Sequence, residues 1–490
     1  MKQVIAQLFQ ALQTQQERPA FCIEHTYYSY RQLAETTAAI RRELRHRTEK
    51  NVGLVANDDL QTYASILALW MEGKCYIPLH PGQPLERCLD IIGQMDMTLV
   101  LDSSTETRYQ HVDVIMTARL DCTDSTMEQP ATYADNELAY ILFTSGSTGR
   151  PKGVPLTRGN LQAFVDAFFA MGITLTAEDK GMQMFDLTFD LSVMSYLLPL
   201  LVGGCVYTVS YKHVKYMAAF ELLDTYPITF FMMVPSVIHY LRPYVDELNL
   251  PHLRYALFAG EALMDDDLAA WAACVPNARI MNTYGPTEDT IICTYYDYHP
   301  GQNNKTVNGI VSIGRAMQGV DTFIADEAGH PVAVGEKGEL CLAGAQLTPG
   351  YWHNEEKNRE AFFMKDGKRY YRTGDICTMD EDGDIMYYGR KDSQIKIQGF
   401  RIELSEIECV ARDYFDNSTA VVALPMGDER GINRIELVVE SADATSATEL
   451  MARLKKKLPS YMVPAKIHHR SKFPLNANNK IDRKKLKEEI

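Results

Sequence analysis

Short hydrophobic runs alternate with longer amphipathic stretches through the first half of the chain. NVGLVA at 51–56 precedes LQTYASILALWMEG at 60–73, and LAYILF at 138–143 precedes a segment rich in glycine and hydroxyl side chains. A short apolar run predicts a buried strand, whereas apolar residues spaced three or four apart predict a helix. Strands that alternate with helices predict α/β layers, in which helices cover a sheet.

The second half has a different pattern. Residues 338–352 (GELCLAGAQLTPGYW) and 384–408 (DIMYYGRKDSQIKIQGFRIELSEIE) contain short apolar runs separated by glycine. This spacing predicts short strands joined by turns, and therefore a smaller β-rich region. A chain of 490 residues exceeds one ordinary core, so we expect two or more domains.

Composition narrows the class of protein. Hydrophobic residues make up 46% and charged residues 23%, as in globular proteins, and the formal charge of −15 argues against general nucleic-acid binding. The final stretch is basic, which is more often a solvated face but could also dock an acidic partner. Residues 1–19 lack the continuous apolar core of a signal peptide, and no segment is long enough to span a membrane. Ten cysteines without a C-x-x-C pair predict buried thiols in the cytoplasm and argue against zinc or disulfides.

The segment LFTSGSTGRPKG at 142–153 begins with the last two residues of the predicted strand 138–143 and continues past the strand's carboxyl end. Glycine allows backbone N–H groups to approach a ligand, hydroxyl groups add donors, and Lys152 adds positive charge, so the segment suits a polyphosphate. It is not a Walker loop, because the GK[ST] ending is absent. Such a run also occurs in ordinary surface turns, but its place after a strand's carboxyl end, where open α/β sheets bind ligands, favours phosphate binding.

Further motifs follow this loop in a fixed order. The chain contains YYSYRQLAE, LALWMEGKCYIPLHPGQPLER, LFTSGSTGRPKGV, FDLSVM, NTYGPTE, GELCLAGAQLTPGY, YRTGDI, GRKDSQIKIQGFRIELSEIE, LPSYMVP and NANNKIDR. This set resembles the adenylate-forming enzymes, specifically the amino-acid adenylation domains of nonribosomal peptide synthetases and the free-standing D-alanine:carrier-protein ligases. The resemblance runs from about residue 28 to residue 483. It implies an α/β fold with a large multi-layer N-terminal domain, residues 1–391, and a small mobile α+β C-terminal domain, residues 392–490.

The resemblance implies that ATP and Mg²⁺ are used to form an acyl adenylate. Both reactants are anions, so the enzyme must supply positive charge and N–H donors. The implied catalytic residue is Lys480, which follows Asn479 where relatives have glycine, and the implied magnesium ligand is Glu288. The implied nucleotide-binding residues are Thr144, Ser145, Gly146, Ser147, Thr148, Gly149, Lys152, Gly260, Glu261, Asn282, Thr283, Tyr284, Gly285, Thr287, Asp375 and Arg390.

Asp190 opens DLSVM at the position where amino-acid-activating relatives pair an aspartate with the substrate's α-ammonium group. A buried carboxylate without a cation is costly, so Asp190 predicts an amino group in the ligand. The remaining pocket residues implied by the resemblance are Leu191, Met194, Met232, Leu257, Ala259, Thr283, Ile291 and Ile292. None is charged, which favours a small or medium apolar amino acid, with alanine of either hand the first to test. Each could equally be an ordinary core residue.

The resemblance also implies a second reaction, in which a phosphopantetheine thiol takes the aminoacyl group and AMP is released. Asp392 is the implied hinge, and Gly399 would leave room for the pantetheine arm. No carrier-type GGxS site follows the last motif, so we expect a separate carrier protein. We expect no nucleic acid and no membrane as partners.

The sequence leaves three alternative functions open. An acyl-CoA synthetase on the same scaffold would use free coenzyme A and an acid without an amine, and Asp190 argues against it. A catalytically silent nucleotide-binding homologue conflicts with the retention of Lys480, Asp375 and Glu288. A nucleic-acid-binding role for the basic end lacks interleaved aromatic residues.

Overall fold

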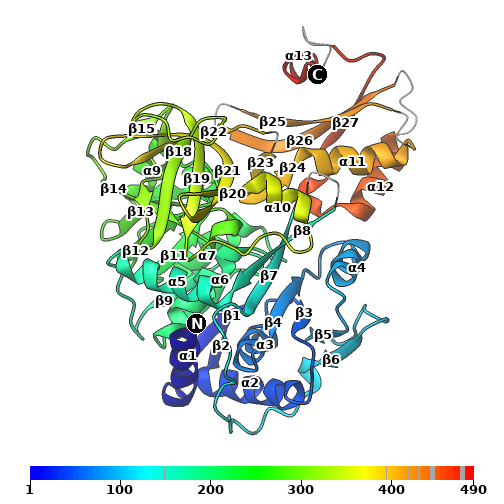
Figure 1. The fold of residues 1–490 in the computed structure, drawn as a ribbon. Helices are drawn as coiled ribbons and strands as arrows, with labels where there is room; N and C mark the ends of the chain where they lie inside the picture. Colours follow the sequence, from blue (N-terminus) through cyan, green and yellow to red (C-terminus); the bar gives the residue numbers. More distant parts are fainter. Residues whose placement is uncertain are drawn as a thin grey trace. The chain divides into compact units, whose positions relative to one another are not determined.

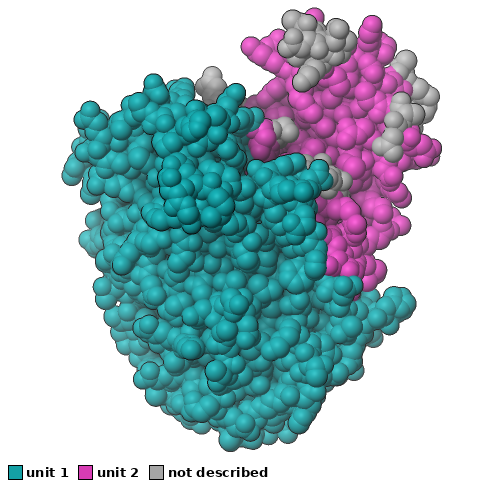
Figure 2. All heavy atoms as spheres, viewed as in Figure 1, with its two compact units in different colours: residues 1–81, 95–142, 153–391 teal, residues 82–94, 143–152, 392–490 magenta. Residues whose placement is uncertain are grey.

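A computed structural model describes residues 1–146, 150–210, 212–392, 394–416, 419–428, 431–441, 447–474 and 481–490. The chain divides into two compact units, shown in teal and magenta in Figure 2. Unit 1 contains residues 1–81, 95–142 and 153–391, and unit 2 contains residues 82–94, 143–152 and 392–490. The last passage from unit 1 to unit 2 lies between Lys391 and Asp392.

A six-stranded sheet in unit 1 contains the strands predicted at 51–56 and 138–143 (Figure 1). Its order is β6-β5-β3-β4-β7-β8, and β3, β4, β5 and β6 pair in parallel. The bounds are β3 (Asn51–Val55), β4 (Cys75–Leu79), β5 (Leu99–Asp102), β6 (Asp113–Met116), β7 (Leu138–Thr144) and β8 (Lys152–Thr157). The predicted helix at 60–73 is α3 (Leu60–Met71), which packs against β3 and β4, so the α/β prediction is confirmed here.

A nine-stranded sheet forms a second layer of unit 1, in the order β17-β14-β13-β12-β11-β9-β10-β1-β2. Neighbouring strands from β1 through β13 in this order are parallel, whereas β2, β14 and β17 pair in the antiparallel direction. The bounds are β1 (Pro19–Ile23), β2 (Thr26–Ser29), β9 (Lys180–Gln183), β10 (Cys205–Thr208), β11 (Phe230–Met233), β12 (Tyr255–Phe258), β13 (Arg279–Tyr284), β14 (Thr294–Tyr298) and β17 (Arg315–Ala316).

Helices of unit 1 pack on these sheets, and two of them begin with a capping box. Ser29 and Gln32 form a capping box at the start of α2, and Thr157 and Asn160 form one at the start of α5. The helices besides α3 are α1 (Lys2–Thr14), α2 (Tyr30–Leu44), α5 (Arg158–Ala170), α6 (Asp190–Leu201), α7 (Lys215–Thr225), α8 (Pro235–Leu241), α9 (Asp265–Ala272), α10 (Glu355–Ala361), η1 (Thr117–Arg119), η2 (Arg242–Glu247) and η3 (Thr287–Asp289). Among the described residues, no helix combines the length and apolarity that a membrane crossing requires.

The glycine-punctuated segments of the second half form short antiparallel strands, as their spacing predicts. Within unit 1 these are β18 (Val320–Ala325), β19 (Gly338–Gly344), β20 (Phe362–Lys365), β21 (Lys368–Met379) and β22 (Ile385–Arg390), with the separate pair β15 (Thr306–Val307) and β16 (Ile310–Val311). β21 is central, because β19, β20 and β22 all pair with it.

Unit 2 has the α+β composition that the resemblance implies. Its three-stranded sheet has the order β25-β26-β27, and α11 packs against β25. The elements are α4 (Leu85–Gln94), β23 (Gln394–Ile397), β24 (Phe400–Glu403), α11 (Leu404–Tyr414), β25 (Val421–Asp428), β26 (Gly431–Glu440), α12 (Ala447–Lys457), η4 (Ser460–Met462), β27 (Lys466–Arg470) and α13 (Arg483–Glu488). A large α/β part and a small α+β part therefore confirm the predicted fold class.

Candidate active site

Asp190 is the first residue of α6, and its side chain is buried. The residue is 6% exposed, and its Oδ2 atom has no hydrogen-bond partner among the described residues. Burial raises the pKa of Asp190 to about 6, although hydrogen bonding from Thr287 opposes the shift and the nearby Glu288 adds to it. A desolvated carboxylate oxygen without a donor is costly, and a cationic ligand would relieve that cost.

Four of the expected pocket residues lie on one face of the nine-stranded sheet. Met232 of β11 is opposite Leu257 of β12, and Leu257 is opposite Met281 of β13. Because side chains alternate along a strand, Ala259 and Thr283 point to the same side as this row. The Thr283 hydroxyl donates to the Phe258 carbonyl at 2.9 Å. Each of the four is at most 2% exposed.

The remaining expected pocket residues come from α6 and from the turn after η3. Leu191 and Met194 are three positions apart, so they lie along one side of the helix, and Met194 is four positions from Asp190. Ile291 and Ile292 are at most 1% exposed. The contact between Asp190 and Thr287 places the start of α6 beside the turn that carries Ile291.

The turn at 285–293 has a strained backbone. Thr290 and Ile291 are consecutive β-branched residues with φ of 51° and 77°. Side chains branched at Cβ rarely adopt this left-handed region, and each such residue costs about 1–3 kcal/mol. The turn closes tightly, because the Cys293 N–H donates to the Tyr284 carbonyl at 2.7 Å and a Cβ at Gly285 would lie 2.5 Å from the Ile291 carbonyl oxygen. Such strain is typical of functional sites.

Glu288, the expected magnesium ligand, lies in η3 and is fully buried. Its Oε1 atom accepts a hydrogen bond from the Tyr351 hydroxyl at 2.7 Å, and its backbone carbonyl accepts one from the Thr348 N–H at 2.8 Å. Carboxylate oxygens are ligands that Mg²⁺ prefers, so Glu288 fits that role chemically. Tyr351 and Thr348 belong to the GELCLAGAQLTPGY motif, but the sequence alone did not predict these contacts.

Asp375, Arg390 and Tyr284 come together, as a shared nucleotide site requires. Asp375 of β21 is directly opposite Arg390 of β22. Arg390 Nη1 donates to Asp375 Oδ1 at 2.8 Å, and the Tyr284 hydroxyl donates to Asp375 Oδ2. Each carboxylate oxygen keeps a second lone pair, so Asp375 can still accept hydrogen bonds from vicinal hydroxyl groups.

Three other expected nucleotide-binding residues also have contacts within the fold. Gly260 has φ of 92°, a conformation that favours glycine. Glu261 Oε2 accepts a hydrogen bond from the Ser236 N–H at 2.9 Å, at the start of α8. Asn282 Nδ2 donates to the carbonyls of Val311 and Ser312 at 3.0 and 2.9 Å. Glu261 and Asn282 therefore stabilise the surrounding fold, and their contact with nucleotide stays a prediction.

The glycine-rich loop belongs to unit 2, where its described residues contact β24 and α11. Ser145 Oγ donates to the Arg401 carbonyl at 2.8 Å, and the Gly146 N–H donates to Glu406 Oε2 at 3.0 Å. Glu406 Oε1 also accepts from Arg87 Nη1 at 2.6 Å. A Cβ at residue 146 would lie 2.0 Å from the Arg150 carbonyl oxygen, so this position requires glycine. The Gly146 amide thus binds an anionic oxygen, the chemistry that a phosphate site needs.

The other predicted residues of this loop divide into two groups. Thr144 ends β7 and its buried hydroxyl has no hydrogen-bond partner among the described residues, while Lys152 is the first residue of β8. Ser147, Thr148, Gly149 and the predicted catalytic Lys480 lie outside the described residues.

Asp392 and Gly399 lie at the start of the last segment of unit 2. Asp392 Oδ1 accepts a hydrogen bond from the Gln394 N–H at 3.1 Å. Gly399 has φ of 81° in the tight turn between β23 and β24, a conformation that disfavours other residues. Their roles as hinge and pantetheine channel stay predictions.

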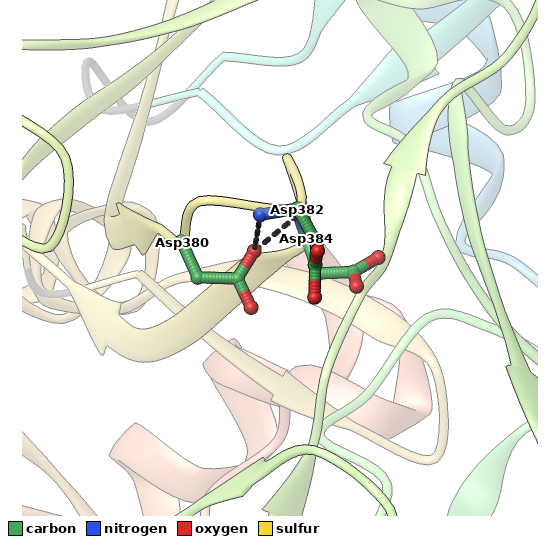
Figure 3. Close-up of side chains that lie close together, drawn as sticks. All are labelled: Asp380, Asp382 and Asp384. Atoms are coloured by element: carbon green, nitrogen blue, oxygen red, sulfur yellow. Dashed lines mark hydrogen bonds between the residues drawn. The ribbon is translucent and has the colours of Figure 1, made fainter.

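Three aspartates at the β21–β22 turn lie close enough together to hold a metal ion, but the Lys305 ammonium group contacts all three. Asp380, Asp382 and Asp384 lie close together, and Asp380 accepts the backbone N–H groups of the other two (Figure 3). Lys305 Nζ is 2.6, 2.7 and 2.6 Å from one oxygen of each. Burial alone would lower the pKa of Lys305, but the three carboxylates raise it above its usual value. This group therefore stabilises the turn through Lys305.

Comparison with known proteins agrees with this geometry. Residues 8–352 match the family described as AMP-binding enzyme. The chain therefore belongs to the AMP-binding enzyme family, and its class is that of the AMP-forming, adenylate-forming ligases. It is similar to the D-alanine–D-alanyl carrier protein ligase of Lactiplantibacillus plantarum, with 32% identity over 96% of this chain and 94% of that protein.

Two further similarities define the range of relatives. Tyrocidine synthase 2 of Brevibacillus parabrevis is 30% identical over 98% of this chain, and the chain spans 14% of that protein's length. The adenylation domain AlmE of Vibrio cholerae, solved in complex with glycyl-adenosine-5′-phosphate, has a TM-score of 0.87 and 26% identity, covering 99% of this chain and 98% of that one. The match therefore includes both multidomain synthases and proteins of the same length as this chain.

Proposed function

We propose that the chain activates a small or medium apolar amino acid as an aminoacyl adenylate and transfers it to the thiol of a carrier protein. The observation that carries this proposal is the buried Asp190 carboxylate, one oxygen of which has no hydrogen-bond partner among the described residues. An α-ammonium group would pair with that oxygen. None of the other expected pocket residues is charged, so the pocket would favour an uncharged substrate side chain.

In the first reaction, a carboxylate oxygen of the amino acid attacks the α-phosphorus of ATP. A bond forms between that oxygen and phosphorus, the bond to the β-phosphate oxygen breaks, and pyrophosphate leaves. Asp190 would hold the amine and thereby orient the carboxylate. Asp375 and Arg390 would bind the ribose hydroxyls and the adjacent phosphate, and Tyr284 would lie against adenine.

Positive charge near the phosphates lowers the barrier, because negative charge accumulates there. Glu288 would hold Mg²⁺, which when bound shields the phosphate oxygens. Lys480 would neutralise charge between the carboxylate and the α-phosphate, and the loop from Thr144 to Lys152 would hold the β- and γ-phosphates. The Gly146 N–H bound to a carboxylate oxygen supports the anion-binding character of this loop.

In the second reaction, a thiolate sulfur attacks the adenylate carbonyl carbon, a thioester forms and AMP leaves. We propose that the acceptor is the phosphopantetheine arm of a separate carrier protein. The similarity to D-alanine–D-alanyl carrier protein ligases supports this acceptor and makes alanine the first substrate to test. Asp392 as hinge and Gly399 beside the pantetheine arm belong to this step. We expect a cytoplasmic location, as the cysteine usage in the sequence predicts.

Exchange of labelled pyrophosphate into ATP tests the first reaction directly. We expect exchange that depends on an amino acid, with D-alanine, L-alanine and glycine among the strongest of a panel of the common amino acids. A preference for a charged amino acid would contradict the pocket assignment. Exchange with acids that lack an amine, together with formation of a CoA thioester, would favour the acyl-CoA synthetase instead.

A silent nucleotide-binding homologue remains the second alternative. It would bind ATP but form no AMP with any acid in the panel. Asp375 paired with Arg390, and Glu288 held by Tyr351, argue for an intact site rather than a decayed one.

A further inference from the structure

Gln346 is a buried amide in the loop between β19 and α10, and its side chain enters the strained turn that follows η3. It is 1% exposed. Its Nε2 atom lies 3.1, 3.3 and 2.8 Å from the backbone carbonyl oxygens of Asp289, Thr290 and Ile292. The Thr290 hydroxyl donates in return to the backbone carbonyl of Gln346. The Gln346 side chain therefore connects to three residues of the turn.

The hydrogen bonds from Gln346 hold a strained segment of the backbone. Thr290 and Ile291 adopt φ of 51° and 77°, so the backbone there follows neither a helix nor a strand. A conformation of this kind persists only when its surroundings hold it. The Gln346 amide supplies N–H donors to the carbonyls of Asp289, Thr290 and Ile292.

The segment that carries Gln346 is itself firmly held. Asn160 Nδ2, at the start of α5, donates to the carbonyls of Ala345 and Leu347 at 2.8 and 3.0 Å. The Thr348 hydroxyl donates to the Pro155 carbonyl in β8. Gln346 is thus fixed on both sides by the end of β8 and the first turn of α5, and it can act as a rigid support.

We propose that Gln346 is a positioning residue for amino-acid selection, because it sets the places of Ile291 and Ile292 in the substrate pocket. This inference rests on the proposed function, in which those two side chains line the pocket. Glu288 has separate supports, the Thr348 N–H and the Tyr351 hydroxyl. Loss of the Gln346 amide should therefore disturb the amino-acid pocket and leave the nucleotide side of the site largely intact.

Gln346→Met tests the proposal, since methionine fills a similar volume but donates no hydrogen bond. Steady-state exchange kinetics with glycine, alanine and valine should show a KM for the amino acid at least tenfold higher and a change of at least tenfold in the ratio of kcat/KM between two of these substrates. The KM for ATP should stay within about twofold. Unchanged selectivity, or equal increases in both KM values, would overturn the proposal.

A control variant and a second measurement separate this role from general destabilisation. Asn304 also bonds a turn through its amide, to the carbonyls of His299 and Gln302 at 2.9 and 3.2 Å, but that turn carries no expected pocket residue. Asn304→Ala should leave selectivity unchanged. Should Gln346→Met fail to fold, Gln346→Asn, which keeps a shorter amide, should shift selectivity in the same direction by a smaller factor, and wild-type selectivity in that variant would overturn the proposal.

Amide hydrogen exchange keeps the test independent of the proposed function. If the wild-type protein supports no amino-acid-dependent exchange of pyrophosphate, the proposed function fails, and the support by Gln346 can still be measured. Exchange of the backbone amides of residues 290–293 should be at least tenfold faster in Gln346→Met, or in Gln346→Asn, than in the wild type. Equal exchange rates would overturn the support itself.

Discussion

Two buried carboxylates, Asp190 in unit 1 and Glu406 in unit 2, differ in what surrounds them. Glu406 is fully buried, and its oxygens accept from Arg87 Nη1 at 2.6 Å and from the Gly146 N–H at 3.0 Å. Asp190 is 6% exposed, and one of its oxygens has no hydrogen-bond partner in the part of the chain that the structure describes. The two carboxylates are similarly buried, but only Glu406 has a hydrogen-bond donor for each oxygen among the described residues.

The difference separates structural from binding carboxylates. A buried charge that is paired and hydrogen-bonded belongs to the fold, and breaking its pair destabilises the protein. A buried carboxylate with an unused oxygen carries a cost in the free protein that a ligand can remove. By this criterion Glu406 connects the glycine-rich loop to α4 and α11 within unit 2, whereas Asp190 is the carboxylate that, under the proposed function, would pair with a substrate amine.

The largest effect is expected when Glu406, in unit 2, loses its charged partner. Arg87→Ala would leave Glu406 buried with a single donor, which typically costs about 3–5 kcal/mol. Amide hydrogen exchange in α4 and α11 would measure the loss, as a lower free energy of local opening. The double variant Arg87→Met, Glu406→Gln keeps an acceptor for the Gly146 N–H without a charge, so it should recover at least half of the lost stability. Equal loss in both variants would mean that packing, and not charge, explains the effect.

The second prediction concerns the pH dependence of substrate binding at Asp190. The carboxylate must be ionised to pair with an ammonium group, and burial raises its pKa to about 6. The carboxylate is half ionised near pH 6, so binding of the amino acid should be full from about pH 7 and should weaken by up to about tenfold for each pH unit below about pH 6. Steady-state kinetics would show this as a rising KM for the amino acid.

Two controls isolate Asp190 in this titration. The KM for ATP should not follow the same profile, and Asp190→Asn should remove the dependence of the amino-acid KM on pH. Glu288, Tyr76 and Tyr140 also interact electrostatically with Asp190. The tyrosine hydroxyls are neutral in this range because burial raises their pKa values further. A wild-type profile that persists in Asp190→Asn would assign the titration to another group.

A smaller effect is expected when the Lys305 ammonium group, which contacts three aspartates, is removed. Lys305→Met should destabilise unit 1 by about 1–2 kcal/mol, because Asp380, Asp382 and Asp384 would lose their shared cation while solvent still screens part of the turn. Millimolar Ca²⁺ should raise the melting temperature of this variant and leave that of the wild type unchanged. Stabilisation of the wild type by Ca²⁺ at this turn would show a metal site that Lys305 does not block.

Local patterns in the sequence predicted much of the fold. The strands predicted at 51–56 and 138–143 and the helix predicted at 60–73 are present as β3, β7 and α3. The spacing of apolar residues and the turn residues between them determine elements of this kind. Asp190, Glu288 and Asp375 were found through their motifs. The row of expected pocket residues on the nine-stranded sheet follows from strand register, which places side chains of β11, β12 and β13 on one face.

Long-range contacts could not be predicted in this way. Gln346 and Thr290 are 56 positions apart, and Arg87 and Glu406 are 319 apart, so no local pattern connects them. The basic end of the chain was open between a solvated face and a docking surface, and the structure pairs Lys456 and Lys457 with Glu86 of α4. Lys305 likewise contacts acids about 75 positions away. These contacts arise from the folded arrangement of elements.

The most direct test of the central claim compares an amino acid with the same acid lacking its amine. Pyrophosphate exchange should be measured with the preferred amino acid, alanine in the first instance, and with its desamino analogue, propionate, in the wild type and in Asp190→Asn. The wild type should prefer the amino acid by at least about 100-fold in kcat/KM, about 2.7 kcal/mol, and the variant should lose most of that preference. An Asp190→Asn variant that still prefers the amino acid by the wild-type factor would contradict the assignment of Asp190 to the substrate amine.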